Sequence, residues 1–346
     1  MKTTYATKSH ALGRREFLTA AAVGGGGFAL GLRGATPVGR QALAADRNKA
    51  LIAITLDMEM SRNFPAWENT HWDYEKGNLN EPTKRYCVDA AKRVKANGGV
   101  IHFFAVGRVL EQESVNWLQE IARDGHPIGN HTYDHVWVLA KRPEDVQFRF
   151  KRAPWLIAGK SAPEAIRDNI EMTSAALKAR IGVAADGFRT PGGFDPGLNG
   201  REDVQRMLLD LGFDWISCKA PKVNTGLAGT RPTRAIFDEI VKAQPQAQPF
   251  LYPTGLIDVP MSPISDVHAF RNGRWKLEDF LTAIRLGVEW AIENRAVYDF
   301  LAHPSVLYPS DPEFKAIDLI CDLVKKAGDR AALVDLGTIA ARVKLK

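Results

Sequence analysis

Residues 51–59 read Leu-Ile-Ala-Ile-Thr-Leu-Asp-Met-Glu, and this stretch indicates both the fold and one edge of a site. The nearly all-apolar run 51–56 predicts a short strand covered on both faces, as in a parallel sheet. Asp57 and Glu59 follow directly and, two positions apart, point to the same side of an extended chain. Burying both carboxylates is costly unless a cation or a retained proton compensates. Alternatively, both acids are solvated in a loop.

Apolar runs of this kind alternate with amphipathic segments along the chain. Further strands are predicted at 100–105, 187–189, 213–217, 297–302 and 332–334. Helices are predicted at 81–97, 114–123, 163–181, 201–211, 277–294, 312–326 and from 338 onward. Strands that recur after helices predict parallel βαβ units in an α/β protein, and about seven such repeats suggest barrel-like closure. No linker or internal repeat divides the chain after residue 44, so we expect a single domain.

A histidine pair follows the short run 126–130, which has the pattern of a strand end, the usual address of a site in an α/β protein. His131 and His135 are separated by three residues, which would place both on one side of a helical turn. Both imidazoles could then reach one metal ion. Together with Asp57 or Glu59 they would form a two-histidine, one-carboxylate site with positions left for water and substrate. The same spacing also arises by chance.

Two further residues stand at predicted strand ends. Arg189 precedes the turn Pro191-Gly192-Gly193 and could hold a carboxylate with its planar guanidinium, or it could be a surface arginine beside a tight turn. His303 ends the apolar strand 297–302 and could act as a general acid. A histidine there could equally be a hydrogen-bonded core residue.

Three long connections, at 60–80, 136–161 and 219–250, are candidates for the walls of a substrate groove, because loops after strands carry the site in a β/α barrel. The first contains Trp67, Trp72 and Tyr74 among charged residues. Aromatic rings of this kind suit sugar rings, or they pack the loop onto the domain.

The N-terminus has the pattern of a Tat export signal. Arg14-Arg15 precedes an apolar run interrupted by glycines at 24–27, and Ala42-Leu43-Ala44 matches a peptidase site. We therefore expect a leader at 1–44, a mature domain at 45–346, and a periplasmic or extracellular location. The interrupted run is too short for a membrane span, so no membrane anchor is expected after cleavage.

Charge and cysteine content limit the classes of partner. Six of the 46 basic residues and one of the 40 acids lie in residues 1–44, which leaves 40 bases against 39 acids. This balance gives no support for nucleic acid or membrane binding. The cysteines at 87, 218 and 321 lie far apart, with no CxxC pair, and are expected to be buried thiols, although one disulfide would be compatible with the sequence.

The order of these motifs resembles a known family. A strand-end Asp, then His-Thr-x-x-His, then Arg-x-Pro-x-Gly, then Leu-x-His is similar to the polysaccharide deacetylases of carbohydrate esterase family 4, the NodB-homology fold. The resemblance covers roughly residues 50–305. It implies a distorted (β/α)7 barrel and a divalent metal, most commonly zinc, with cobalt, nickel or manganese as alternatives.

The resemblance also implies roles for single residues. Asp57 would be the general base, oriented by Arg189, and His303 would protonate the leaving amine. His131 and His135 would bind the metal. The substrate would be contacted by Leu301, which would line the pocket for the acyl methyl group, and by Pro191 and Trp72.

The sequence departs from the family pattern at three points. Met58 stands where a second acid is usual, so Glu59 is expected to be the third metal ligand, as in the Asp-x-Glu version of peptidoglycan deacetylases and allantoinases, and a swap of roles with Asp57 stays open. Gly192 stands where an aromatic residue is common, which removes one wall of the groove. The fourth motif, Asp-x-x-Asp-Trp, is not recognisable.

These features predict an exported, metal-dependent hydrolase that removes N-acetyl groups from a polysaccharide or other glycan. An amidase or cyclic imidase, similar to allantoinases and acting on a small non-peptide C–N bond, would use the same mechanism, but export argues against it. An inactive glycan-binding barrel is a third interpretation. Such a protein would be expected to have lost Asp57 or His303, and both are present.

Overall fold

The computed structural model describes residues 37–61 and 76–345, with side chains from Gln41 onward. Two groups of predicted residues lie outside this part of the chain. They are the twin-arginine pair with most of the predicted leader, and the aromatic run of the first long connection, including Trp72.

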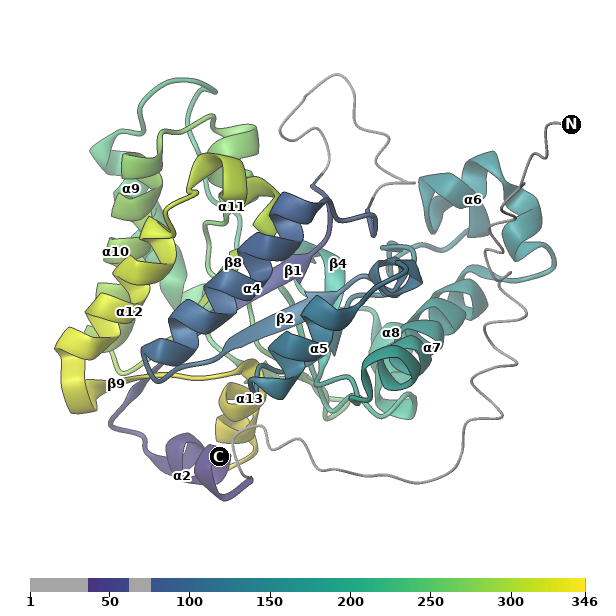
Figure 1. Cartoon of the computed structure of the whole chain (residues 1–346), viewed down its shortest axis with the longest axis horizontal. Coiled ribbons are helices and arrows are strands. Elements are labelled where there is room, and N and C mark those ends of the chain that lie inside the picture. Colours follow the sequence, from purple (N-terminus) through teal and green to yellow (C-terminus); the bar gives the residue numbers. More distant parts are fainter. Residues whose placement is uncertain (1–36, 62–75, 346) are drawn as a thin grey trace, which may run out of the picture. The chain divides into compact units, whose positions relative to one another are not determined.

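Nine described strands form one sheet (Figure 1). They are β1 (Ala50–Met58), β2 (Ile101–Ala105), β3 (Ile128–Asn130), β4 (Phe188–Phe194), β5 (Trp215–Lys219), β6 (Phe250–Leu251), β7 (Ile257–Asp258), β8 (Val297–Ala302) and β9 (Ala331–Leu333). The order is β6-β7-β5-β4-β3-β2-β1-β8, with β9 also paired to β1. Neighbours are parallel except β6 and β7. No pairing among these strands joins β6 to β8, so the barrel is open between them.

The described helices include every predicted one and several that the pattern did not indicate. They are α2 (Pro37–Ala45), α4 (Glu81–Ala96), α5 (Asn116–Arg123), α6 (Phe148–Arg152), α7 (Ala162–Ile181), α8 (Glu202–Asp210), α9 (Arg234–Ala243), α10 (Leu277–Glu293), α11 (Pro304–Ser310), α12 (Lys315–Ala327) and α13 (Leu336–Lys344). Local chemistry sets the ends of α7, where Ser161 and Glu164 form a capping box and Gly182 ends the helix in the left-handed conformation. The predicted single-domain α/β barrel is thus confirmed in a distorted, incompletely closed form.

The core lies between the sheet and its helices. All nine residues of β1 are buried, which is the condition that its apolar sequence predicted. Because β1 lies between β2 and β8, its carboxyl end is flanked by the carboxyl ends of both neighbours. Polar residues that follow these strands are therefore brought together at one edge of the sheet.

Helix α2 contains the predicted cleavage site and packs against α13 (Figure 1). Ala44 is fully buried, and the Arg342 guanidinium donates to the backbone oxygens of Leu43, Asp46 and Lys49. Residues 37–45 are thus part of the folded domain, so the experiments proposed below use the chain without truncation. No described helix is long and apolar enough to cross a membrane. The three cysteines are buried and form no disulfide.

Candidate active site

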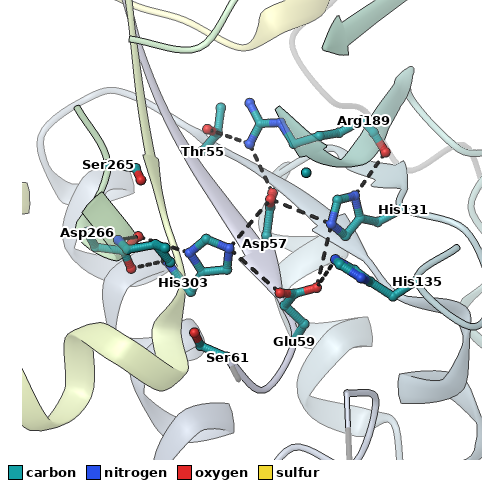
Figure 2. A network of polar contacts seen from close by, with 12 residues as sticks. Thr55, Asp57, Glu59, Ser61, His131, His135, Arg189, Ser265, Asp266 and His303 are labelled. Atoms are coloured by element: carbon teal, nitrogen blue, oxygen red, sulfur yellow. Dashed lines mark hydrogen bonds and ion pairs between the residues drawn. The ribbon is translucent and has the colours of Figure 1, made fainter. Parts of the chain in front are cut away.

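The residues predicted to be catalytic or to bind the metal meet at the carboxyl edge of the sheet (Figure 2). Asp57 lies at the end of β1 and Glu59 directly after it, Arg189 lies in β4, and His303 is the residue after β8. His131 and His135 follow β3. These residues come from four strands, β1, β3, β4 and β8, that lie far apart in the sequence. The order of the strands in the sheet brings their side chains within contact distance.

Arg189 is fully buried and organises the carboxylates beneath the site. Its Nη1 donates to Oδ1 of Asp57 at 2.9 Å, and its Nη2 donates to Oδ2 of Asp299 at 2.6 Å. The guanidinium also lies 4.3 Å from the centre of the Phe104 ring. Burial raises the pKa of Asp299 to about 6, although Arg189 favours its charged form. The alternative of a surface arginine is wrong, because the Arg189 side chain is buried. Its positive charge compensates the two buried carboxylates of Asp57 and Asp299.

Glu59 lies between the two histidines that the sequence singled out. Its Oε2 is 2.7 Å from Nε2 of His135 and 3.6 Å from Nε2 of His131. One ligand atom from each of these residues lies within 4.8 Å of the others, which is a distance compatible with a shared ion. Oδ2 of Asp57 lies at a similar distance from Nε2 of His131, 3.7 Å, but Asp57 does not belong to this group of mutually close ligand atoms.

The donor set suits a divalent metal of the zinc type. Oε2 of Glu59 is buried, and the imidazole nitrogens nearest to it are Nε2 of His135 at 2.7 Å and Nε2 of His131 at 3.6 Å. Burial lowers the pKa of His135 to about 4, so its imidazole is neutral and offers a lone pair at neutral pH. The neutral imidazole of His135 carries one proton, so Nε2 either donates it to Oε2 of Glu59 at 2.7 Å or, with the proton on Nδ1, offers a lone pair to a cation bound by both residues. Two imidazole nitrogens and one carboxylate oxygen are a common ligand set of catalytic zinc.

The loop that carries the histidines differs from the predicted helical turn. Thr132 and His135 have φ of 59° and 55°, in the left-handed region that side chains other than glycine seldom adopt. Asn130 Oδ1 accepts from the backbone N–H of Thr132, and the Thr132 hydroxyl accepts from that of Val136. The imidazoles still converge, with ring centres 5.0 Å apart. The prediction of convergence is therefore right, and the predicted helical geometry is wrong.

The backbone of the arginine strand orients His131. Nδ1 of His131 lies 2.9 Å from the carbonyl oxygen of Arg189, an acceptor, so Nδ1 carries the proton. In the neutral imidazole, Nε2 is then the ring nitrogen with the lone pair, and it is directed toward Glu59. This arrangement, in which the second ring nitrogen donates to a carbonyl, is the usual one for histidines that bind metals.

Lys76 was not singled out from the sequence, yet it is buried in the site. Its Nζ forms an ion pair with Oε1 of Glu59. Burial alone would raise the pKa of Glu59, but His135 and Lys76 outweigh it and hold this pKa well below its usual value. Glu59 is therefore charged and presents mainly Oε2 to the histidines.

His303 is held by Asp266, a second residue that sequence reasoning missed. Oδ1 of Asp266 accepts from Nδ1 of His303 at 2.9 Å, and Oδ2 accepts from the His303 backbone N–H at 2.6 Å. Nε2 of His303 points into the site, 4.0 Å from Oδ2 of Asp57. Burial opposes protonation of His303, but Asp266, with Glu59 and Asp57, raises its pKa above the usual value. His303 can thus carry a proton at neutral pH, as a general acid requires.

We expect Asp266→Asn to narrow the pH range of activity. A raised pKa keeps His303 protonated to higher pH, so loss of the Asp266 charge should move the alkaline limb of the kcat/KM profile to lower pH. Activity at neutral pH should fall roughly tenfold or more. A pH–rate profile measures this, with Ser265→Ala as the control, because Ser265 contacts His268 instead. A fall in activity without movement of the alkaline limb would contradict the proposed effect on the His303 pKa.

A cleft of about 610 Å³ opens onto these groups. Leu301 and Pro191, two of the residues that the resemblance implies as substrate contacts, line this cleft. Trp72, the third residue of that prediction, lies outside the described residues. Trp137, from the second long connection, also lines the cleft and was not among the predicted site residues.

The three buried charged residues that sequence reasoning missed, Asp299, Lys76 and Asp266, carried different amounts of signal in the sequence. Asp299 is an isolated acid in an otherwise apolar strand, Val297 to Ala302, and such an acid requires a buried partner. That reasoning would have linked Asp299 to Arg189. Lys76 and Asp266 stand in irregular segments without periodicity, and nothing in their local sequence separates them from surface residues.

Comparison with known proteins supports the resemblance drawn from the motifs. Residues 74–214 match the family model described as polysaccharide deacetylase. This segment contains His131, His135 and Arg189, and it ends before His303. No protein with a curated description matches the chain significantly.

Solved structures share the fold. A protein assigned as a polysaccharide deacetylase from Mycobacterium smegmatis aligns with a TM-score of 0.56 and 16% identity, covering 86% of this chain and 91% of that one. One from Pseudomonas aeruginosa PAO1 aligns with a TM-score of 0.56 and 13% identity, over 86% and 92%. The allantoinase Puue aligns with a TM-score of 0.55 and 13% identity, over 86% and 92%. At these identities the alignments establish the fold alone.

Proposed function

We propose that this chain, which resembles the polysaccharide deacetylases in sequence and in fold, is a metal-dependent hydrolase that removes N-acetyl groups from a glycan. The observation that carries the proposal is the buried Oε2 of Glu59, which faces Nε2 of His135 at 2.7 Å and of His131 at 3.6 Å. A base and an acid, Asp57 and His303, stand beside this ligand group.

Glu59, His131 and His135 would hold the metal, and zinc fits this ligand set best. With three protein ligands, positions remain for water and for the substrate carbonyl. Glu59 is assigned as the carboxylate ligand in preference to Asp57, because Oδ1 of Asp57 accepts from Arg189, whereas Oε2 of Glu59 lies 2.7 Å from Nε2 of His135 and forms a group with both histidines. When bound, the metal would polarise the amide carbonyl and lower the pKa of water.

Asp57 would remove a proton from the water that attacks the carbonyl carbon. Arg189 would fix the orientation of Asp57 by donating to its Oδ1. His303, protonated because of Asp266, would donate a proton from Nε2 to the amine nitrogen as the C–N bond breaks. The products are acetate and a free amino group on the sugar. Leu301 would contact the acyl methyl group from the wall of the cleft.

Export of the folded protein by the Tat pathway is part of this proposal. It rests on the twin-arginine sequence Arg14-Arg15 and the apolar run that follows. A periplasmic or extracellular location would bring the site to cell-wall or environmental glycans. Fractionation of cells that express the chain tests this, with Arg14→Lys combined with Arg15→Lys as the variant expected to stay in the cytoplasm.

The activity itself is tested by acetate release from acetylated glycans. The full chain, loaded with zinc, should release acetate from chitooligosaccharides or peptidoglycan fragments, which carry N-acetyl groups, and a chelator should abolish the release, with recovery on addition of zinc. Acetylated xylan, which carries O-acetyl esters, is assayed in parallel to distinguish ester cleavage from N-deacetylation. Absence of acetate while the protein holds one metal ion per chain would contradict deacetylation. Small amides and cyclic imides, assayed in parallel, would then identify the alternative C–N hydrolase.

A further inference from the structure

Trp137 occupies a specific place beside the proposed metal site. It lies two residues after His135, and the residue between them, Val136, is fully buried in the core. The Trp137 side chain is 46% exposed and lines the cleft that also contains His131 and His135. A large apolar ring is therefore left in contact with solvent at the entrance to the site.

Several contacts fix the segment that carries Trp137 to the histidine loop. The Trp137 backbone N–H donates to the carbonyl oxygen of Val146 at 2.8 Å. Nε2 of Gln147, a buried side chain, donates to the carbonyl oxygens of Asp134 and His135 at 2.8 and 3.1 Å. Nη1 of Arg149, on α6, donates to Oδ1 of Asp134 at 2.6 Å. The backbone that carries Trp137 is thus held by the same segment that holds the backbone of His135, so a ligand that binds would need to order only the indole side chain.

Position 192, also in the wall of the cleft, has no side chain and leaves room for a bulky substrate. A Cβ on Gly192 would meet only Cε1 of Phe194, at 3.9 Å, among atoms within 4 Å. Gly192 also has φ of +79°, which disfavours any larger residue there. Among the described lining residues, Trp137 and Phe194 are the ones with a phenyl or indole ring.

We propose that Trp137 stacks against the pyranose ring that carries, or directly adjoins, the acetamide to be cleaved, so that it selects sugar-borne acetamides over small acyclic amides. This inference rests on the proposed deacetylase function and deepens it. One face of a pyranose presents axial C–H groups, which pack on an aromatic face, while its hydroxyls require hydrogen-bond partners. Asp195, Lys222 and Asn272 line the same cleft and supply such polar groups.

The test compares Trp137→Ala and Trp137→Phe with wild type on N-acetylglucosamine oligomers of increasing length. Trp137→Ala should raise KM about tenfold, with kcat within about twofold of wild type, and Trp137→Phe should restore most of the affinity. Trp155→Ala is the matched control, because Trp155 is 72% exposed and does not line the cleft. Hydrolysis of a small acyclic acetamide should be the same in all four proteins.

Binding is measured separately from turnover, by calorimetric titration of chitotetraose into zinc-loaded Asp57→Asn protein with and without Trp137→Ala. The inference is overturned if KM and Kd are unchanged in Trp137→Ala, if Trp155→Ala has an equal effect, or if Trp137→Ala loses its metal. If wild type releases no acetate yet binds the oligomer through Trp137, deacetylation fails and the stacking site stands. If acetate is released and Trp137→Ala behaves as wild type, the stacking site fails and deacetylation stands.

Discussion

Asp57→Asn is expected to keep the metal and to lose nearly all turnover, with kcat reduced by roughly 10²–10⁴-fold. The substitution preserves the size of the side chain and an oxygen that can accept from Nη1 of Arg189. It removes the basic oxygen, Oδ2, that lies 3.7 Å from His131 and 4.0 Å from His303. Acetate release gives kcat, and metal analysis of the purified protein gives the zinc content.

Asp299→Asn is the matched control for this variant. Asp299 also binds Arg189, and so the same charge is removed from the same guanidinium, but Asp299 does not line the cleft. Its kcat should fall far less than that of Asp57→Asn. Equal losses in both variants would mean that the Arg189 ion-pair network, rather than a base at Asp57, accounts for the effect. Loss of zinc from Asp57→Asn would make Asp57 a ligand.

Glu59→Gln is expected to weaken zinc binding by at least about 100-fold, because loss of a direct carboxylate ligand should cost more than the 10–100-fold typical of outer contacts. Both the charge and the basicity of Oε2, the atom that faces His131 and His135, are lost. Titration of the metal-free protein with zinc, against a competing chelator, measures the affinity directly and does not depend on activity.

Stability must be measured alongside, since Glu59 also pairs with the buried Lys76. Loss of this partner leaves an ammonium group in a buried position and should lower the thermal stability of the metal-free protein. The melting temperatures of metal-free wild type and Glu59→Gln separate this effect from zinc affinity. Unchanged zinc affinity in Glu59→Gln, together with zinc loss in Asp57→Asn, would reverse the two assigned roles.

The hydrophobic pattern of the sequence was sufficient to predict the α/β architecture. β1 is buried along its whole length, as the apolar run 51–56 predicted, and the helices at 81–97 and 163–181 appear as α4 and α7 with shifts of a residue at their ends. This works because burial on both faces and helical amphipathicity are local properties of the sequence. The short helices α6, α9 and α11 were missed because tertiary contacts, rather than a long periodic pattern, stabilise them.

The order of short motifs in the sequence pointed to the candidate site residues. It did not predict how these residues are arranged in space. The sequence left the roles of Asp57 and Glu59 interchangeable. In the structure one accepts from Arg189 and the other faces two imidazoles. Likewise, the spacing of His131 and His135 predicted a helical turn, whereas left-handed residues and the hydroxyl of Thr132 give the loop a different path.

The sequence by itself determined the order of strands and helices, the strand ends at which polar residues stand, and the chemical types available there. Only the tertiary structure decided that β1 lies between β2 and β8, which brings Asp299 and His303 to residues more than 240 positions earlier in the chain. It also decided that Lys76 and Asp266 belong to the site. The physical reason is that the environment of a buried charge is set by strand order and by its partners across the sheet, neither of which leaves a periodic signal in the local sequence.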